Sequence, residues 1–209
     1  MLQKIIKYLL ILLFFGLLIY NAIYFKKISE MQVSKITAFD AKAYAKTYLL
    51  EKIPAAKKEA VAIADLLSAM KKDSKKAFTN YSHFQNEGDT KYFFVKGEGK
   101  VTAIDEEFVT VKNTASGTEI KLAIQYIFDN TARDCSGLIS IDDFSNTMDL
   151  NNVSEEINKL IKAEIVAPFI AKVKKGDSIS FLGGIELSQS EPKTDKLEII
   201  PLQLEINSK

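Results

Sequence analysis

The chain opens with an unbroken apolar run from Tyr8 to Phe25, with lysines on both sides. Roughly eighteen helical residues rise about 27 Å, close to the hydrocarbon thickness of a bilayer. A cleaved signal peptide also begins with lysines, but this run ends in aromatic residues that favour the membrane interface rather than in small residues. We therefore expect residues 1–27 to be an uncleaved anchor that contacts the membrane through residues 8–25. The similar lysine content of the two flanks does not predict its orientation.

The rest of the chain has room for one ordinary domain, or for a small helical module and a compact β-domain. Its 28 basic residues nearly balance its 27 acidic residues, so no strong field is expected to hold nucleic acid. The single cysteine, Cys135, cannot form an internal disulfide. We expect neither a nucleic-acid partner nor a cofactor.

Residues 28–37 are polar and suit either a linker or a continuation of the anchor helix. Beyond Asp40, apolar residues recur at helical spacing, which predicts an amphipathic helix. Pro54 then permits a second helix to start, because the first turn of a helix needs no N–H from its proline. We expect residues 28–86 to hold a linker and a helical hairpin. Its apolar stripe either packs against the next domain or forms a membrane-surface or partner groove.

From Thr90 onward the pattern changes to strands separated by short polar turns. The pair Gly97-x-Gly99 is expected to be a bulge or sharp bend in a long strand rather than a phosphate loop, because no helix follows it. One long helix, capped by Asn152 and ended or kinked by Pro168, interrupts the strands. The predicted strands cover 91–95, 99–104, 108–111, 120–124, 178–187 and 197–206.

This order of elements predicts an α+β chain in which residues 87–209 form an OB-fold-like five-stranded β-barrel. The first strand is long and bent, and the one long helix lies between strands 3 and 4. Partly open barrels of this kind often bind oligonucleotides or oligosaccharides. The fold alone does not settle the function.

Polar residues that could bind a ligand gather between the third barrel strand and the long helix. Arg133 is the only arginine of the chain, and its planar guanidinium suits a bidentate partner. That partner is either internal (Asp129, Asp134 or Asp142) or a ligand carboxylate, phosphate or sugar hydroxyl. The candidate ligand-binding residues are Asp129, Thr131, Arg133, Asp134, Asp143, Phe144 and Asn146.

The sequence offers little that is typical of an enzyme. The aspartates between residues 129 and 143 lack the glycine and closing glutamate of an EF-hand, so no metal site is expected. The only histidine, His83, lies in a polar stretch and is expected to be a solvated loop residue. Cys135 is expected to be a quiet, packed thiol. We expect a protein that is not an enzyme.

A series of short segments, in order and spacing, matches a known bacterial family. These segments are Phe39-Asp40-Ala41-x-x-Tyr44, Pro54-Ala55, 95–101, 131–134, 143–146, Ile157-Asn158, 175–181 and 200–202. Together they resemble the predicted periplasmic lipoproteins of unknown function, domain of unknown function 2291. The resemblance implies that the soluble domain lies in the periplasm, so together with the expected anchor we expect a single-pass protein of the bacterial inner membrane. Members are often encoded beside sugar ABC-transporter components, which implies such components, or a small carbohydrate-type ligand, as partners.

The chain departs from this family pattern in two places. Ile127-Phe128 and Asp129-Asn130-Thr131 stand where the family usually has Gly-Pro and Arg-Gly-Thr, so a second arginine is missing. A helix replaces the lipid anchor, because no cysteine is available there. We expect a binding or accessory module linked to sugar ABC transport. A scaffolding component of an envelope complex without a small-molecule ligand is the alternative.

Overall fold

A computed structural model describes residues 6–8, 13–14, 39–83, 88–195 and 197–207. The residues from Asp40 onward form one compact unit. The expected anchor and the linker after it lie almost entirely outside the described residues. Among the residues that are described, no helix has the length and apolar character needed to cross a membrane.

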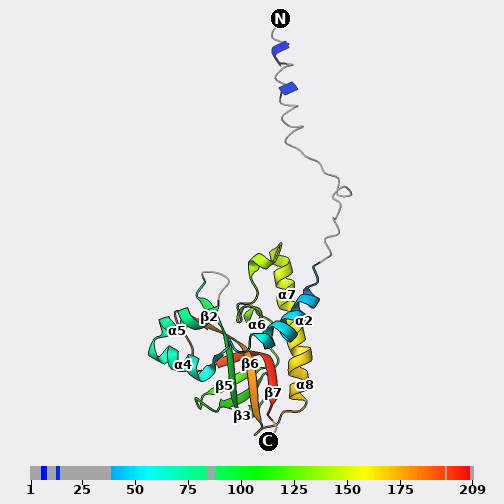
Figure 1. Cartoon of the computed structure of the whole chain (residues 1–209). Helices are drawn as coiled ribbons and strands as arrows, with labels where there is room; N and C mark the ends of the chain where they lie inside the picture. The colour runs from blue at the N-terminus through cyan, green and yellow to red at the C-terminus, as the bar shows by residue number, and fades with distance from the viewer. Residues whose placement is uncertain (1–5, 9–12, 15–38, 84–87, 196, 208–209) are drawn as a thin grey trace. The chain divides into compact units, whose positions relative to one another are not determined.

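Five strands close into the barrel that the element order predicts (Figure 1). They are β3 (Thr90–Ile104), β4 (Phe108–Asn113), β5 (Glu119–Ala123), β6 (Ser178–Ser188) and β7 (Leu197–Ile206). Neighbours follow the order β3-β4-β5-β7-β6, and β6 pairs again with β3. Only β5 and β7 run parallel within this ring. The OB-like α+β fold is therefore confirmed.

The two glycines of β3 allow close contacts between strands rather than forming the predicted bulge. A Cβ on Gly99 would lie 2.5 Å from the carbonyl oxygen of Lys112 on β4, and one on Gly97 would lie 2.5 Å from the ring of Phe181 on β6. The shift of register comes later, between Val101 and Ala103. The glycines lie near the point where β3 begins to pair with β4 while still paired with β6.

The helix between strands 3 and 4 of the barrel is longer than expected. It comprises α7 (Thr147–Leu160), the π-helical η3 (Ile161–Val166) and α8 (Ala167–Ile170). Its N-cap is Asn146, whose side chain accepts a hydrogen bond from the Asp149 amide, so the prediction of a cap at Asn152 is wrong. Pro168 lies inside this continuous helix, directly after its π-helical segment, and the helix continues past it to Ile170.

The region before the barrel does not form the predicted hairpin. Its first helical run joins α2 (Ala41–Thr47), η1 (Tyr48–Lys52) and α3 (Ile53–Ala55); its second joins α4 (Ile63–Lys72) and α5 (Ser74–Tyr81). Pro54 lies inside the first run and does not start the second. The second run begins at Ile63 because β1 (Val61–Ala62) is held in extended pairing beside β3. A further short strand, β2 (Ser82–His83), pairs with β3 on the same side of the barrel.

The two helical runs bury their apolar residues in different clusters. The first cluster joins α2 and α7 to the outer face of the barrel through Tyr48, Ile157 and Leu182. The second fills the barrel and includes α4 and α5 through Leu66, Phe78 and Phe93. In Figure 1 these helices accordingly lie on opposite sides of the barrel. The helical stripe therefore packs against the barrel domain, the first of its two predicted alternatives.

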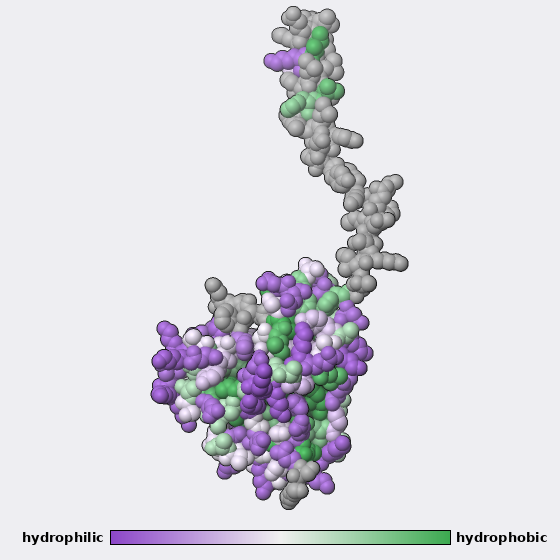
Figure 2. All heavy atoms as spheres, in the orientation of Figure 1, coloured by the Kyte–Doolittle hydropathy of each residue, from purple (hydrophilic) through white to green (hydrophobic). Residues whose placement is uncertain are grey.

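The face of the molecule in Figure 2 is mostly hydrophilic, but apolar side chains gather in a stripe beside α8. A groove of about 520 Å³ lies between η1, the end of the long helix and β7. Its apolar lining residues are Leu49, Leu50, Pro54, Ile165, Pro168, Phe169, Leu202, Leu204 and Ile206.

Gly99→Ala is expected to lower the free energy of unfolding by about 1–3 kcal/mol, because the added methyl group meets the backbone of β4. The control is Glu98→Ala, an exposed position on the same strand, which should change stability by less than about 0.5 kcal/mol. Urea unfolding of the two variants measures the difference. Equal stability would contradict the close approach of the strands at Gly99.

Candidate functional site

The predicted site centres on α6 (Thr131–Asp134), a short helix after β5 that the sequence pattern did not reveal. Arg133 bonds bidentately to its neighbour Asp134, with Nε 2.5 Å from Oδ1 and Nη2 2.8 Å from Oδ2. The two residues are only 5% and 3% exposed. Among the internal partners predicted for Arg133, the one that it bonds to in the structure is Asp134. A desolvated pair of this kind satisfies most of its own hydrogen-bonding groups.

The same guanidinium connects α6 to the long helix. Nη1 of Arg133 donates to the hydroxyl of Ser154, 2.8 Å away on α7. That hydroxyl in turn lies 3.3 Å from the Leu150 carbonyl oxygen, one turn earlier. The pair of Arg133 and Asp134 therefore fixes the position of α6 against α7.

Tyr48 holds α6 from the other side. Its hydroxyl donates to the Ala132 carbonyl oxygen at 2.8 Å and lies 2.9 Å from the Ser136 hydroxyl. Tyr48 is fully buried, and this burial raises the pKa of its hydroxyl well above the usual range. The sequence placed Tyr48 on a helical face but gave no sign of this polar contact, because its partners lie more than 80 residues away.

Asp129 and Thr131 shape the loop that leads into α6. A carboxylate oxygen of Asp129 accepts from the Thr131 amide at 2.8 Å, and the Thr131 hydroxyl donates to Glu186 of β6 at 3.2 Å. Burial raises the pKa of the Glu186 carboxyl, the nearby charge of Asp129 raises it further, and the bond from Thr131 opposes both effects.

The remaining predicted residues stabilise the turn before α7. Asp143, at the end of η2 (Ile141–Asp143), accepts from the Ser140 amide at 3.0 Å in a capping box. The ring of Phe144 packs 5.4 Å from that of Tyr44 on α2. Asn146 caps α7, as described above. Their contacts are thus distinct from those made by Asp129, Thr131, Arg133 and Asp134.

A hollow of about 340 Å³ lies beside this loop, between residues 127–130 and the long helix. Asn158 lies on its wall, only 6% exposed, and donates from Nδ2 to the Asp129 carbonyl oxygen at 2.8 Å. This bond fixes the orientation of the amide, because an oxygen in that place could not donate. The other amide atom, Oδ1, is buried and has no hydrogen-bond partner within the described structure.

The rim of this hollow carries an exposed aromatic ring. Phe128 is 75% exposed, and its ring centroid lies 6.3 Å from that of Tyr126 at nearly a right angle. The polar lining residues are Asn130, Asn151, Ser154, Glu155, Asn158, Lys159 and Lys162. Sequence reasoning singled out this loop but did not choose Phe128 or Asn158 as candidate site residues, because Phe128 is apolar and Asn158 lies on the long helix, outside the loop.

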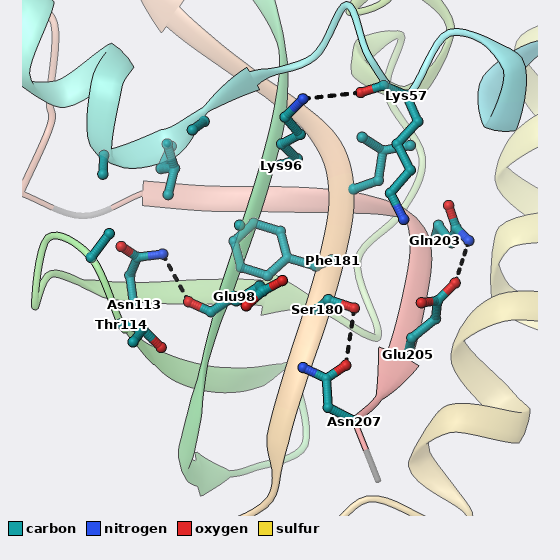
Figure 3. A pocket seen from close by; sticks show the side chains of 16 residues that line it. Lys57, Lys96, Glu98, Asn113, Thr114, Ser180, Phe181, Gln203, Glu205 and Asn207 are labelled. Carbon is teal, nitrogen blue, oxygen red and sulfur yellow. Dashed lines mark hydrogen bonds between the residues drawn. The ribbon is translucent and has the colours of Figure 1, made fainter.

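A larger cavity, of about 640 Å³, lies along the side of the barrel (Figure 3). Phe181, Leu182 and Ile63 supply apolar surface to it. Its polar lining residues are Lys57, Lys96, Glu98, Asn113, Thr114, Ser180, Gln203, Glu205 and Asn207. No sequence motif could reveal this cavity, because its residues come from the chain before β1, from five strands, from the start of α4 and from a turn.

The reactive side chains considered in the sequence are shielded. Cys135 is buried, and the burial raises the pKa of its thiol, which keeps it protonated and unreactive. His83 lies half-buried in β2 rather than in a solvated loop, and burial lowers its pKa. Within the described ranges, no three His, Cys, Asp or Glu side chains come together in a way that could hold a metal ion.

Arg133→Ala is expected to lower the free energy of unfolding by about 3–5 kcal/mol, because it leaves Asp134 buried without its partner. The double variant Arg133→Met/Asp134→Leu should lose less than Arg133→Ala alone, since it removes both charges. Lys159→Ala, which breaks exposed ion pairs with Glu155 and Glu156, serves as the control and should cost below about 1 kcal/mol. Thermal unfolding measures all three; an Arg133→Ala variant as stable as the control would contradict the role of the buried pair.

Comparisons with known proteins agree with this fold. The chain is similar to an OB-fold protein from Thermotoga maritima, with a TM-score of 0.71 and 24% sequence identity, over 81% of this chain and 99% of that one. At this identity the likeness shows the fold alone. A search of the curated proteins found no match. The model of the predicted periplasmic lipoproteins, domain of unknown function 2291, matches residues 13–205, and the chain belongs to this family.

Proposed function

We propose that this protein is a non-enzymatic binding module that takes a small carbohydrate-type ligand in the hollow beside α7. The observation that carries the proposal is Oδ1 of Asn158, a buried acceptor without a partner in the described structure. Leaving such a group unbonded costs about 1–3 kcal/mol. A ligand hydroxyl that reaches the hollow supplies the missing donor once the exposed side chains of the rim move aside.

The lining of the hollow matches the surface of a sugar. A sugar ring has an apolar C–H face, which can lie against the exposed ring of Phe128. Its hydroxyls can both donate and accept, which suits the amides of Asn130 and Asn151 and the charged ends of Lys162 and Glu155. Lys162 belongs to η3, and π-helical turns of this kind often lie at functional sites.

In this proposal the residues predicted from the sequence prepare the site. Asp129 anchors the amide of Asn158 through its carbonyl oxygen. Arg133 and Asp134 hold the position of Ser154, one turn before Asn158 on the same helix. Thr131 fixes the loop, while Asp143, Phe144 and Asn146 set the start of α7.

A scaffolding role in an envelope complex is the second candidate. It is favoured by the completeness of the buried contacts of Arg133, Asp134 and Tyr48, which serve the packing of α2, α6 and α7 without a ligand. In that case the hollow binds no small molecule, and the side chains of Tyr126 and Phe128 have a role other than holding a sugar.

We further propose that the soluble unit works in the periplasm beside sugar ABC-transporter components, attached to the inner membrane by the apolar run at residues 8–25. The family description supports the periplasmic location. The length and apolar character of the run support the attachment.

Phe128→Ala is expected to weaken sugar binding about tenfold or more while leaving the fold intact, because the side chain is largely exposed. A screen of the full chain against neutral hexoses, pentoses and sugar acids by thermal shift identifies the ligand. A ligand at a hundred times its dissociation constant adds about 2.7 kcal/mol of stability. Titration of the best ligand then compares the variant with the unaltered chain.

The matched control is Met148→Ala, which removes another apolar side chain, 70% exposed but outside the hollow. It should bind sugar as the unaltered chain does. If no sugar shifts the melting temperature of the chain, the result favours the scaffolding role over the sugar-binding role. If a sugar binds equally to the Phe128→Ala variant, the site assignment is wrong.

The proposed anchor predicts that the full chain stays in the membrane fraction after washing at high salt and at alkaline pH. Replacing Leu12 and Leu17 with lysine should release it, because charged residues near the middle of a spanning helix cost about 2.5–3.5 kcal/mol each. Replacing Lys26 and Lys27 with alanine controls for surface charge and should not release it. Release of the unaltered chain by salt alone would refute an integral anchor.

A further inference from the structure

The cavity along the side of the barrel brings opposite charges to one surface without pairing them. Lys57 reaches it from the chain before β1, Glu98 from β3 and Glu205 from β7. In the part of the chain that the structure describes, no ion pair joins either lysine of the cavity to either glutamate. In Figure 3, Lys57 extends toward Gln203, and Glu98 lies across the cavity beside Phe181.

The backbone around the cavity is held in place by its own hydrogen bonds. The ammonium group of Lys96 donates to the Lys57 carbonyl oxygen at 3.3 Å, which fixes the turn that carries Lys57. The Asn113 amide donates to the Glu98 carbonyl oxygen at 2.9 Å. The side chains of Lys57 and Glu98 therefore extend from backbone that these hydrogen bonds hold in place.

Gln203 adds an acceptor to the side of the cavity formed by β7. Its Nε2 donates to Glu205 at 2.5 Å, which fixes the orientation of the amide. Oε1 of Gln203 is then buried and without a partner among the described residues. This oxygen and the Glu205 carboxylate together form a group of acceptors that suits a ligand ammonium group.

We propose that this cavity binds a small zwitterion, a free α-amino acid. Its ammonium group bonds to Glu205 and to Oε1 of Gln203, and its carboxylate bonds to the ammonium group of Lys57. The side chain of the amino acid lies over the apolar surface of Phe181 and Leu182. A ligand that carries both charges can bond to Lys57 and to Glu205 at once, and charge-assisted hydrogen bonds are the strong ones.

Other ligand classes fit the cavity less well. A neutral sugar carries no charge that can pair with Lys57 or Glu205. An anion such as phosphate is repelled by Glu98 and Glu205, and a simple cation by Lys57 and Lys96. A peptide carries its terminal charges far apart, whereas an α-amino acid holds them on one carbon atom. The volume of about 640 Å³ lies within the usual range for small-molecule sites.

The test is a calorimetric titration of the full chain, in detergent, with each of the twenty standard L-amino acids up to about 10 mM. The best binder is then compared with its amino alcohol, which lacks the carboxylate, and with the matching carboxylic acid, which lacks the ammonium group. Each analogue should bind about tenfold or more weakly, because one charge-assisted contact is lost. Binding of no amino acid in this range, or equal binding of either analogue, would overturn the proposal.

Variants place the ligand. Lys57→Met and Glu205→Gln should each weaken amino-acid binding about tenfold or more, and since both side chains are exposed the fold should persist. The matched controls are Lys58→Met and Glu198→Gln, also exposed but outside the cavity. Phe128→Ala should leave amino-acid binding unchanged, which separates this site from the sugar site. Unchanged binding in Lys57→Met, with normal thermal unfolding, would refute the assignment.

Discussion

The pairing of β3 with strands on two sides is the constraint on which the rest of this structure depends. Residues 90–100 pair with β6, and residues 99–104 pair with β4, so one strand closes the barrel. That double pairing requires neighbouring backbones to approach closely, and Gly99 makes it possible. Replacing the glycine would separate β3 from β4 at the place where the ring closes. The cavity beside Lys96 and Glu98 also borders this stretch of β3.

The helical layer depends on a different kind of interaction. Apolar packing brings α2 and α7 onto the outer face of the barrel, but it does not by itself fix the position of each helix along its axis. Directional hydrogen bonds fix this position. Tyr48, the first residue of η1 directly after α2, ties this helical run to the α6 backbone, and Arg133 ties α6 to Ser154 on α7. A matched apolar pair can often replace buried ions at little cost, so we expect the pair of Arg133 and Asp134 to contribute specificity more than stability.

The barrel was predictable from the sequence because its strands alternate and its turns carry polar residues and glycine. The long helix was also predictable, but its start was not. Asn146 and Asn152 are both good caps by type, and only the turn built around Asp143 and Phe144 selects the first. The hairpin failed because β1, only two residues long, depends on β3, more than 30 residues away. Local periodicity contains no information about such a pairing.

The candidate site, like the fold, was predictable from the sequence only in part. The unusual use of one arginine drew attention to the loop at α6, but a bidentate partner for Arg133 proved to be its own neighbour in the chain. The features that favour ligands come instead from Asn158 and Gln203. Each has an amide nitrogen that bonds within the protein and an oxygen left without a partner in the described structure.

These two amides are also the basis of the different ligands that we propose for the hollow beside α7 and for the cavity along the barrel. Near Asn158 the acceptor lies in a hollow lined by the exposed ring of Phe128, by other amides and by charged side chains, a setting that we propose for ligand hydroxyl groups. Near Gln203 it lies beside the carboxylate of Glu205, with Lys57 also on the cavity surface, a setting for separated charges on one small molecule. Both settings carry lysine and glutamate side chains, so we base the two proposals on what lies nearest to each amide: an exposed aromatic ring on the rim beside Asn158, and a carboxylate bonded to Gln203 itself.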